Sequence, residues 1–249
     1  MAKCFQSILG DRSAINGSLS HFNMASDLKE DTLPGSIDIK EMANVCFTDY
    51  VLVGSKEKLD FMQKVMEDLN ALEKPLVEND FGNLWMGCIL TRLGIDWTTV
   101  PCRGKVTSFQ RVEDGRMEVE VESAWEDLDE AWLAIRHKLV HVRIFYFAQE
   151  TSSEYLRTND VEGRYFPCRF VLDFSNERKN VFLQEGFSSI GQVVKFINDN
   201  GLLGKPVLRE TLYDVQEALD EYWALHEEED LTCNLMEVEV VSDALSGVF

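Results

Sequence analysis

Residues 117–123 read MEVEVES, and this strict alternation of apolar and acidic side chains decides the fold expected for the chain. Successive side chains on a β-strand point to opposite faces of a sheet. Met117, Val119 and Val121 therefore share one face, and three glutamates share the other. A strand with one apolar and one charged face is typical of an antiparallel sheet that covers a core on one side only.

The elements around this strand follow from turns and periodicity. The turn at 113–115 (EDG) predicts a hairpin with a strand at 103–111. Residues 44–54 (NVCFTDYVLVG) are β-branched and aromatic, which predicts another strand. Apolar residues at helical spacing over 59–72 predict a helix that ends before Pro75.

A short helix at 84–93, a helix at 127–138 and a strand at 140–148 complete the first half of the chain. The order is then strand, helix, strand, strand, helix, strand, with the short helix as an addition. This order predicts an α+β fold, a ferredoxin-like βαββαβ unit whose antiparallel sheet carries its helices on one face. We expect His141 and Arg143 to lie near the acidic side chains of residues 118–122 and to neutralise part of that row.

The C-terminal half predicts a strand-helix-helix-strand region after a loop at 150–163. Its expected elements are a strand at 164–174, helices at 188–198 and 211–225, and a strand at 234–241. We expect this region to pack on the same sheet or to extend it.

Three parts of the chain follow from these patterns. Residues 1–41 contain turn signals without sustained periodicity and are interpreted as an N-terminal arm or extension. Residues 42–150 hold the ferredoxin-like unit, and residues 151–249 hold the C-terminal α+β region.

Charge is concentrated in two stretches of the 249-residue chain, whose formal net charge is −20. Nine acids and one base lie within 113–130, and seven acids without a base lie within 217–230. Such surfaces repel duplex nucleic acid, because binding to phosphates depends on Lys and Arg. A basic protein partner is expected instead, and the second stretch offers Glu227, Glu228 and Glu229 as contacts. A purely solubilising surface remains the alternative.

Other classes of protein have little support in the sequence. Apolar runs are far shorter than a membrane span, and MAKCFQSILG at the N-terminus does not resemble a secretory signal. Six cysteines are scattered singly without a C-x-x-C pair, which indicates reduced thiols and a cytoplasmic location. His137 and His141 lack the context of a helical zinc motif. We expect neither a metal nor another cofactor, and the oligomeric state stays open.

Polar residues gather in one loop, TNDVEGRY at 158–165. Polar groups on a loop held by a rigid sheet are often functional. The candidate binding residues are Asn159, Asp160, Arg164 and Tyr165, together with Trp125 as a possible neighbour. The alternative is structural: an ion pair between Asp160 and Arg164 braces the loop while Tyr165 packs.

Several segments resemble one protein family, and the resemblance covers roughly residues 42–241. They are MANVCFTDYVLVG, LWMGCILTRLGIDW, CRGKV, ESAW and TNDVEGRYFP. The chain resembles the ferredoxin-like proteins of unknown function carried on plasmids, phages and conjugative elements of gut and enteric bacteria. The resemblance implies a fold and a mobile-element setting. It implies no established reaction and therefore no catalytic residue.

Three functions stay open at this level. The first is a non-catalytic protein-interaction module that uses its acidic surfaces or the 158–165 loop. The second is a nucleic-acid mimic, or an inhibitor of a host defence or regulatory protein, which needs carboxylates spaced along one surface. The third is an enzyme with its site near the 158–165 loop, which needs titratable groups around a concave pocket.

Truncation tests the assignment of residues 1–41 as an arm. A chain that starts at Met42 is expected to keep its thermal midpoint within about 5 °C of the full chain, because the arm contributes little to the core. Calorimetry of both chains at one pH and salt concentration is the measurement. A larger fall would show that the arm is part of the core.

Overall fold

A six-stranded sheet forms the centre of the computed structural model, which describes residues 44–150, 155–176, 181–226 and 231–247. The arm expected at 1–41 lies outside the described residues. The strand order is β2-β3-β1-β4-β5-β9, so the first strand lies in the interior of the sheet. Its strands are β1 (Val45–Val53), β2 (Gly104–Glu113), β3 (Arg116–Ala124), β4 (Arg143–Glu150), β5 (Leu156–Thr158) and β9 (Glu239–Val240).

Strand β1 is antiparallel to both of its neighbours. It pairs with β3 from Val45 opposite Ala124 to Val53 opposite Arg116, and with β4 from Cys46 opposite Glu150. Strands β2 and β3 form the expected hairpin, with two register irregularities along β2. The described chain is therefore an α+β protein built on antiparallel strands, as the alternation in residues 117–123 predicts.

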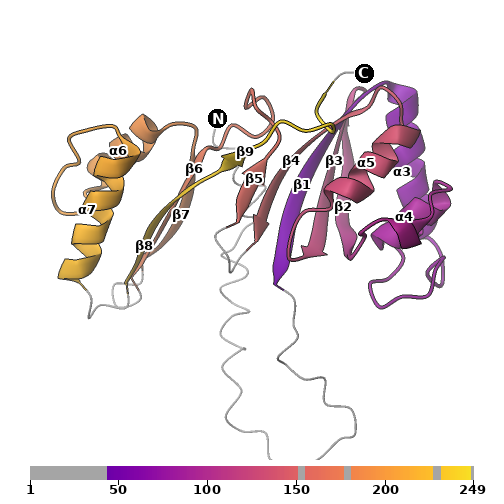
Figure 1. Ribbon diagram of the computed structural model, residues 1–249, viewed down its shortest axis with the longest axis horizontal. Coiled ribbons are helices and arrows are strands. Elements are labelled where there is room, and N and C mark those ends of the chain that lie inside the picture. The colour runs from indigo at the N-terminus through magenta and orange to yellow at the C-terminus, as the bar shows by residue number, and fades with distance from the viewer. Residues whose placement is uncertain (1–43, 151–154, 177–180, 227–230, 248–249) are drawn as a thin grey trace, which may run out of the picture. The chain divides into compact units, whose positions relative to one another are not determined.

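Three helices pack on one face of this sheet (Figure 1). They are α3 (Lys56–Asn70), α4 (Met86–Arg92) and α5 (Asp129–Lys138). Helix α3 buries the predicted stripe from Leu59 to Leu69, because residues three and four apart lie on one side of a helix. Leu72, at the end of the predicted stripe, follows the helix and is exposed. Met117, Val119 and Val121, which are expected to share one face, are all buried in the same core, together with Val142 and Ile144.

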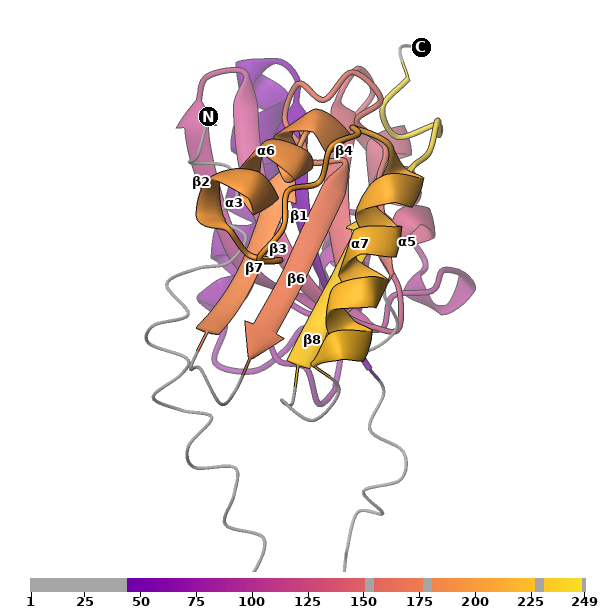
Figure 2. The same cartoon turned by 90° about the vertical axis from the view of Figure 1, so that its left-hand side faces the viewer.

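The C-terminal half contains more strands than expected. Strands β5 and β9 extend the six-stranded sheet, while β6 (Phe170–Asn176), β7 (Val181–Phe187) and β8 (Leu231–Glu237) form a second sheet in the order β7-β6-β8. Helices α6 (Ile190–Asn200) and α7 (Leu212–Leu225) cover one face of that sheet (Figure 2).

The strand-helix-helix-strand pattern thus missed β5 and β7 because of their length and composition. It also assigned one strand to 234–241, where β8 and β9 belong to different sheets. Strand β5 has three residues, which is too short to show a period of two. Strand β7 is interrupted by the residues Gln184, Glu185 and Gly186, and it owes its extended form to a continuous ladder with β6. The expected strand at 164–174 also begins later, at Phe170. No helix among the described residues is long and apolar enough to cross a membrane.

A matched pair of valine substitutions tests the two environments in the sheet. Val119 is 1% exposed and Val112 is 42% exposed. We expect Val119→Ala to lower the free energy of unfolding by about 1–3 kcal/mol, because it leaves a cavity in the core. Val112→Ala is expected to change it by less than about 0.5 kcal/mol. Urea denaturation measures both, and equal losses would contradict the core described above.

Candidate functional site

The loop at 158–165 is attached to the sheet by a buried amide. The Asn159 Oδ1 atom accepts the backbone N–H of Tyr146 at 2.8 Å, and its Nδ2 donates to the carbonyl of Ile144 at 2.9 Å. These two bonds continue the pairing of β4 at the point where β5 ends, since the last β5 residue, Thr158, lies opposite Phe147. Asn159 therefore positions the loop rather than presenting a free amide.

Asp160 turns the chain back toward β6. Its Oδ2 atom accepts the backbone N–H groups of Tyr165 at 2.6 Å and Phe166 at 2.8 Å. Gly163 between them has a φ of +66°, a conformation that favours glycine. These bonds take up the N–H groups that a strand over 164–169 would need, and Pro167 has none to give. This explains why β6 begins only at Phe170.

Arg169 braces the loop from the other side. Its guanidinium donates to the carbonyls of Phe166 at 2.8 Å and Asp160 at 2.7 Å. Arg164 instead pairs with Glu162 at 3.3 Å, while the Asp160 carboxylate accepts backbone N–H groups of the loop. The expected ion pair between Asp160 and Arg164 is therefore not formed. The loop is internally braced, as the structural alternative expects, but the arginine that braces it is Arg169 and not Arg164.

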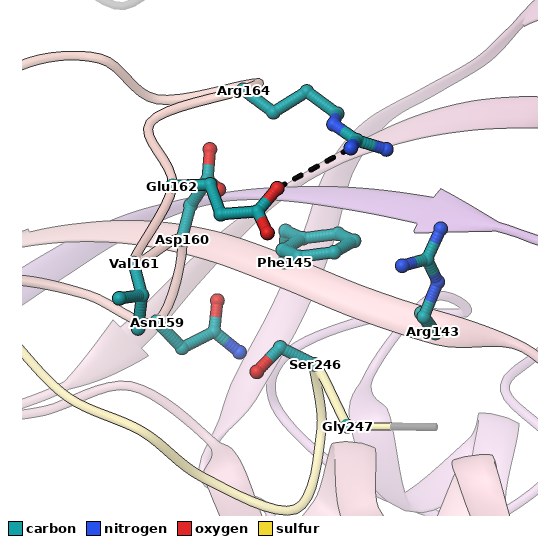
Figure 3. A pocket seen from close by; sticks show the side chains of 9 residues that line it. All are labelled: Arg143, Phe145, Asn159, Asp160, Val161, Glu162, Arg164, Ser246 and Gly247. Carbon is teal, nitrogen blue, oxygen red and sulfur yellow. Dashed lines mark hydrogen bonds and ion pairs between the residues drawn. The ribbon is translucent and has the colours of Figure 1, made fainter. Parts of the chain in front are cut away.

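A pocket of about 290 Å³ opens beside this loop (Figure 3). It lies between the start of β4, the loop and the segment that follows β9. The residues that line it are Arg143, Phe145, Asn159, Asp160, Val161, Glu162, Arg164, Ser246 and Gly247. Tyr165 does not line the pocket but packs on Phe145, with ring centroids 4.9 Å apart. Residues about a hundred positions apart in the chain, such as Arg143 and Ser246, thus line the same cavity.

Only some of the predicted site residues come together here. Asn159, Asp160 and Arg164 line the pocket, and Tyr165 supports it. Trp125 is not among the lining residues: it follows β3, is 57% exposed and has a φ of +74°. Glu227, Glu228 and Glu229 lie outside the described residues.

Sequence reasoning missed Arg143, Phe145 and Asp243 as parts of this site. Arg143 and Phe145 share a face of β4 because they are two residues apart, and this period was the one available signal. Asp243 receives both the Asn159 amide at 3.1 Å and the Ser246 hydroxyl at 3.3 Å. No pattern in the sequence connects Asp243 with residue 159.

The acidic row of β3 lies on the sheet face opposite the helices. Asp49 on β1 is directly across from Glu120, and Glu118 is next on the same face. Lys105 pairs with Glu122 at 2.9 Å and Arg116 with Glu118 at 3.7 Å. The cations of this row are therefore Lys105 and Arg116, and not His141 and Arg143 as the strand assignment suggested. Within the described residues, no cation pairs with Asp49 or Glu120.

This arrangement changes the protonation of Asp49. Burial raises the pKa of Asp49 to about 7, with further contributions from the charges of Glu120 and Glu118. A carboxyl group with such a pKa carries a proton for part of the time near neutral pH. The acidic face therefore holds less charge than a count of its carboxylates indicates.

A second polar cluster lies at the start of α5. The Tyr155 hydroxyl donates to Asp127 Oδ2 at 2.7 Å, and Arg157 is 3.5 Å from both Asp127 and Asp129. Burial, followed by the effects of Asp127, raises the pKa of Asp129 to about 8. The cluster connects β5 with α5, which is a structural role. Among the described residues, no three His, Cys, Asp or Glu side chains are grouped as metal ligands.

The described residues that line the pocket include one hydroxyl group and no histidine or cysteine. Ser246 is its one lining hydroxyl, and that hydroxyl donates to Asp243 rather than to a histidine base.

Compared with known proteins, the chain matches no protein-family model, no curated protein and no solved structure.

The raised pKa of Asp49 predicts a pH-dependent stability. The folded pKa of about 7 lies above the reference value of 3.8, so ionisation favours the unfolded chain. We expect Asp49→Asn to be more stable than the parent, with an advantage that grows from about pH 4 to pH 7 and is level above. Urea midpoints across this range measure it.

Asp80→Asn is the matched control, because Asp80 is exposed and forms no ion pair with the described residues. Its difference from the parent is expected to be small. A constant difference for Asp49→Asn would show that Asp49 is ionised in the fold throughout this range.

Proposed function

We propose that this chain is a non-catalytic protein-interaction module that binds a basic protein through the acidic row on the sheet face opposite the helices. The observation that carries the proposal is the carboxylate row of Glu118, Glu120, Glu122 and Asp49. Lys105 and Arg116 neutralise two of these four groups. Asp49 and Glu120 lie opposite each other without a cation among the described residues, which costs free energy unless a partner supplies the charge.

Exposed apolar side chains adjoin this row. Phe47 is directly opposite Glu122 on the same face and is 47% exposed. Val45 lies two residues before Phe47 on β1 and is opposite Ala124 of β3. Trp125 is the residue after Ala124. Large exposed aromatic residues beside charges are typical of protein interfaces. The expected partner therefore presents Lys or Arg side chains together with an apolar contact.

The fold assignment that accompanies this proposal is ferredoxin-like for residues 42–150. The strand order β2-β3-β1-β4 and the three helices on one face support it. Residues 151–249 are then an addition that both extends the sheet and forms a second one. The mobile-element origin rests on the quoted sequence segments alone. A cytoplasmic location is supported by five cysteines of the described chain, all of which are buried free thiols.

Nucleic-acid mimicry is the second candidate. It is favoured by the regular spacing of Glu118, Glu120 and Glu122, since alternate residues of a strand are about 6.6 Å apart on one face. In this version the basic partner is itself a nucleic-acid-binding protein. Competition between the chain and duplex DNA for that partner distinguishes it from a general interaction module.

Neutralising the acidic row tests the proposal. The full chain and its E118Q/E120Q/E122Q variant are used to capture proteins from an extract of the source cells. The parent is expected to retain a stoichiometric basic protein, and the variant to associate with it roughly tenfold more slowly at low salt, because charge steers the encounter. Association rates at low and physiological salt are measured by surface binding.

The matched control is E73Q/E78Q/D80N, which removes three exposed charges from the segment between α3 and α4. It should bind like the parent. Equal association rates for all three chains, with equal salt dependence, would overturn the proposal and leave the acidic row as a solubilising surface. Thermal denaturation of each variant shows that the comparison is made between folded proteins.

A further inference from the structure

Arg143 is the cation of the pocket lining that forms no ion pair with the described residues. Its guanidinium carbon lies 5.5 Å from the centre of the Phe145 ring, and no carboxylate of the described residues pairs with it. The chain has 44 acidic and 24 basic side chains, so acidic partners are abundant. A half-buried guanidinium at a pocket wall without a carboxylate is therefore an unusual feature of this molecule.

The other polar groups of the pocket are engaged. The Asn159 amide binds the backbone of β4 and Asp243, and the Asp160 carboxylate binds the backbone of the loop. Glu162 and Arg164 form an ion pair, shown by the dashed line in Figure 3. A ligand would compete with these bonds everywhere except at Arg143. The pocket consequently offers one cationic contact.

Apolar surface lies next to this cation. Phe145 lines the pocket and is held in place between Arg143 and the ring of Tyr165. Val161 lines the opposite part and is 57% exposed. Such a wall favours a ligand whose charged group is attached to an apolar or aromatic body.

The chemistry of the ligand follows from charge and size. A guanidinium binds a carboxylate through two parallel hydrogen bonds, which no single ammonium can reproduce. The net charge of −20 repels ligands that carry several negative charges, such as nucleotides. A cavity of about 290 Å³ is at the lower end of the range for small-molecule sites. These limits select a small ligand with one negative charge.

We propose that the pocket beside the 158–165 loop binds a small organic monocarboxylate, with Arg143 holding the carboxylate and Phe145 and Val161 contacting its apolar body. This site lies on the same face of the sheet as the acidic row, with Val51 of β1 between Phe145 and Glu118, but no residue of the row lines it. The two proposals therefore use different residues and are tested separately. It gives the loop a binding function beyond the internal bracing described above.

Titration with 4-fluorobenzoate, followed by fluorine NMR, tests the site on the full chain. We expect saturable binding with a dissociation constant of about 1 mM or lower, as is usual for a single charged contact with a small ligand. The neutral 4-fluorobenzyl alcohol and the cationic 4-fluorobenzylamine have a similar ring and are expected to bind at least about tenfold more weakly. Equal binding of the three probes, or preference for the amine, overturns the proposal.

Arg143→Gln removes the cation and is expected to weaken 4-fluorobenzoate binding about tenfold or more. Arg143→Lys keeps the charge without the fork and should bind with intermediate strength. Arg209→Gln, at an exposed arginine that does not line the pocket, is the matched control and should bind like the parent. Unchanged affinity in Arg143→Gln overturns the proposal. If that variant does not fold, the selectivity of the parent among the three probes decides the question.

The E118Q/E120Q/E122Q variant separates this proposal from the proposed function. It should bind 4-fluorobenzoate at least as tightly as the parent, because none of its substitutions lines the pocket and the removal of negative charge from the same sheet face does not oppose an anion. Loss of protein capture with retained 4-fluorobenzoate binding supports both sites. Retained capture with no 4-fluorobenzoate binding in the parent overturns the pocket alone.

Discussion

The rest of the structure depends on how Tyr50 packs in the middle of the sheet. It lies on β1 between Val119 of β3 and Tyr146 of β4, and its ring is 4.5 Å from that of Trp132 on α5. Its hydroxyl accepts the backbone N–H of Leu128 at 3.2 Å, just before α5 begins. One side chain therefore fixes the helix layer to three strands, since a buried aromatic ring provides a large apolar contact and its hydroxyl needs a partner.

The alternation of β1 gives its two faces different chemistry. Residues on the same face as Tyr50 pack against the apolar sides of the helices, whereas Asp49 on the other face lies beside Glu120 and Glu118. Burial at Asp49 disfavours the charged form and raises its pKa, so the interior of the acidic row is partly neutral. Lys105 and Arg116 neutralise the outer glutamates. The negative charge is therefore not uniform over this face, although the count of acids suggests that it is. The charge that is not balanced among the described residues lies near Glu120.

The buried polar contacts connect the sheet to the pocket. Tyr155, Arg157 and Asp127 join the short strand β5 to the start of α5, and Asn159 then joins the next residues to β4. Buried polar groups are costly when unpaired, so each of these bonds restrains the loop that follows. Asp243 binds Asn159 and thereby holds the segment after β9 against the loop. These bonds hold the loop and the final segment beside β4, and Arg143 of that strand lines the pocket between them.

The amino-acid sequence by itself determined the elements whose pattern is local. The period of two in residues 117–123, the hairpin turn before them and the helical stripe from Leu59 to Leu69 all correspond to observed elements. It also pointed to the 158–165 loop, where Asn159, Asp160 and Arg164 do line a pocket. These features depend on neighbours in the chain, which are visible in any sequence.

Only the tertiary structure decided that β5 and β7 exist and that Arg169, not Arg164, braces the loop. It also decided that Arg143 lines the pocket and that Asp243 binds Asn159 beside it. Strands of three residues or with interrupted apolar patterns take their extended form from ladders with distant partners. Ion pairs and pKa shifts depend on which charges become neighbours and how far they are removed from water. Both are properties of the folded arrangement, because residues 143, 159 and 243 come together only when β4, the loop and the final segment pack.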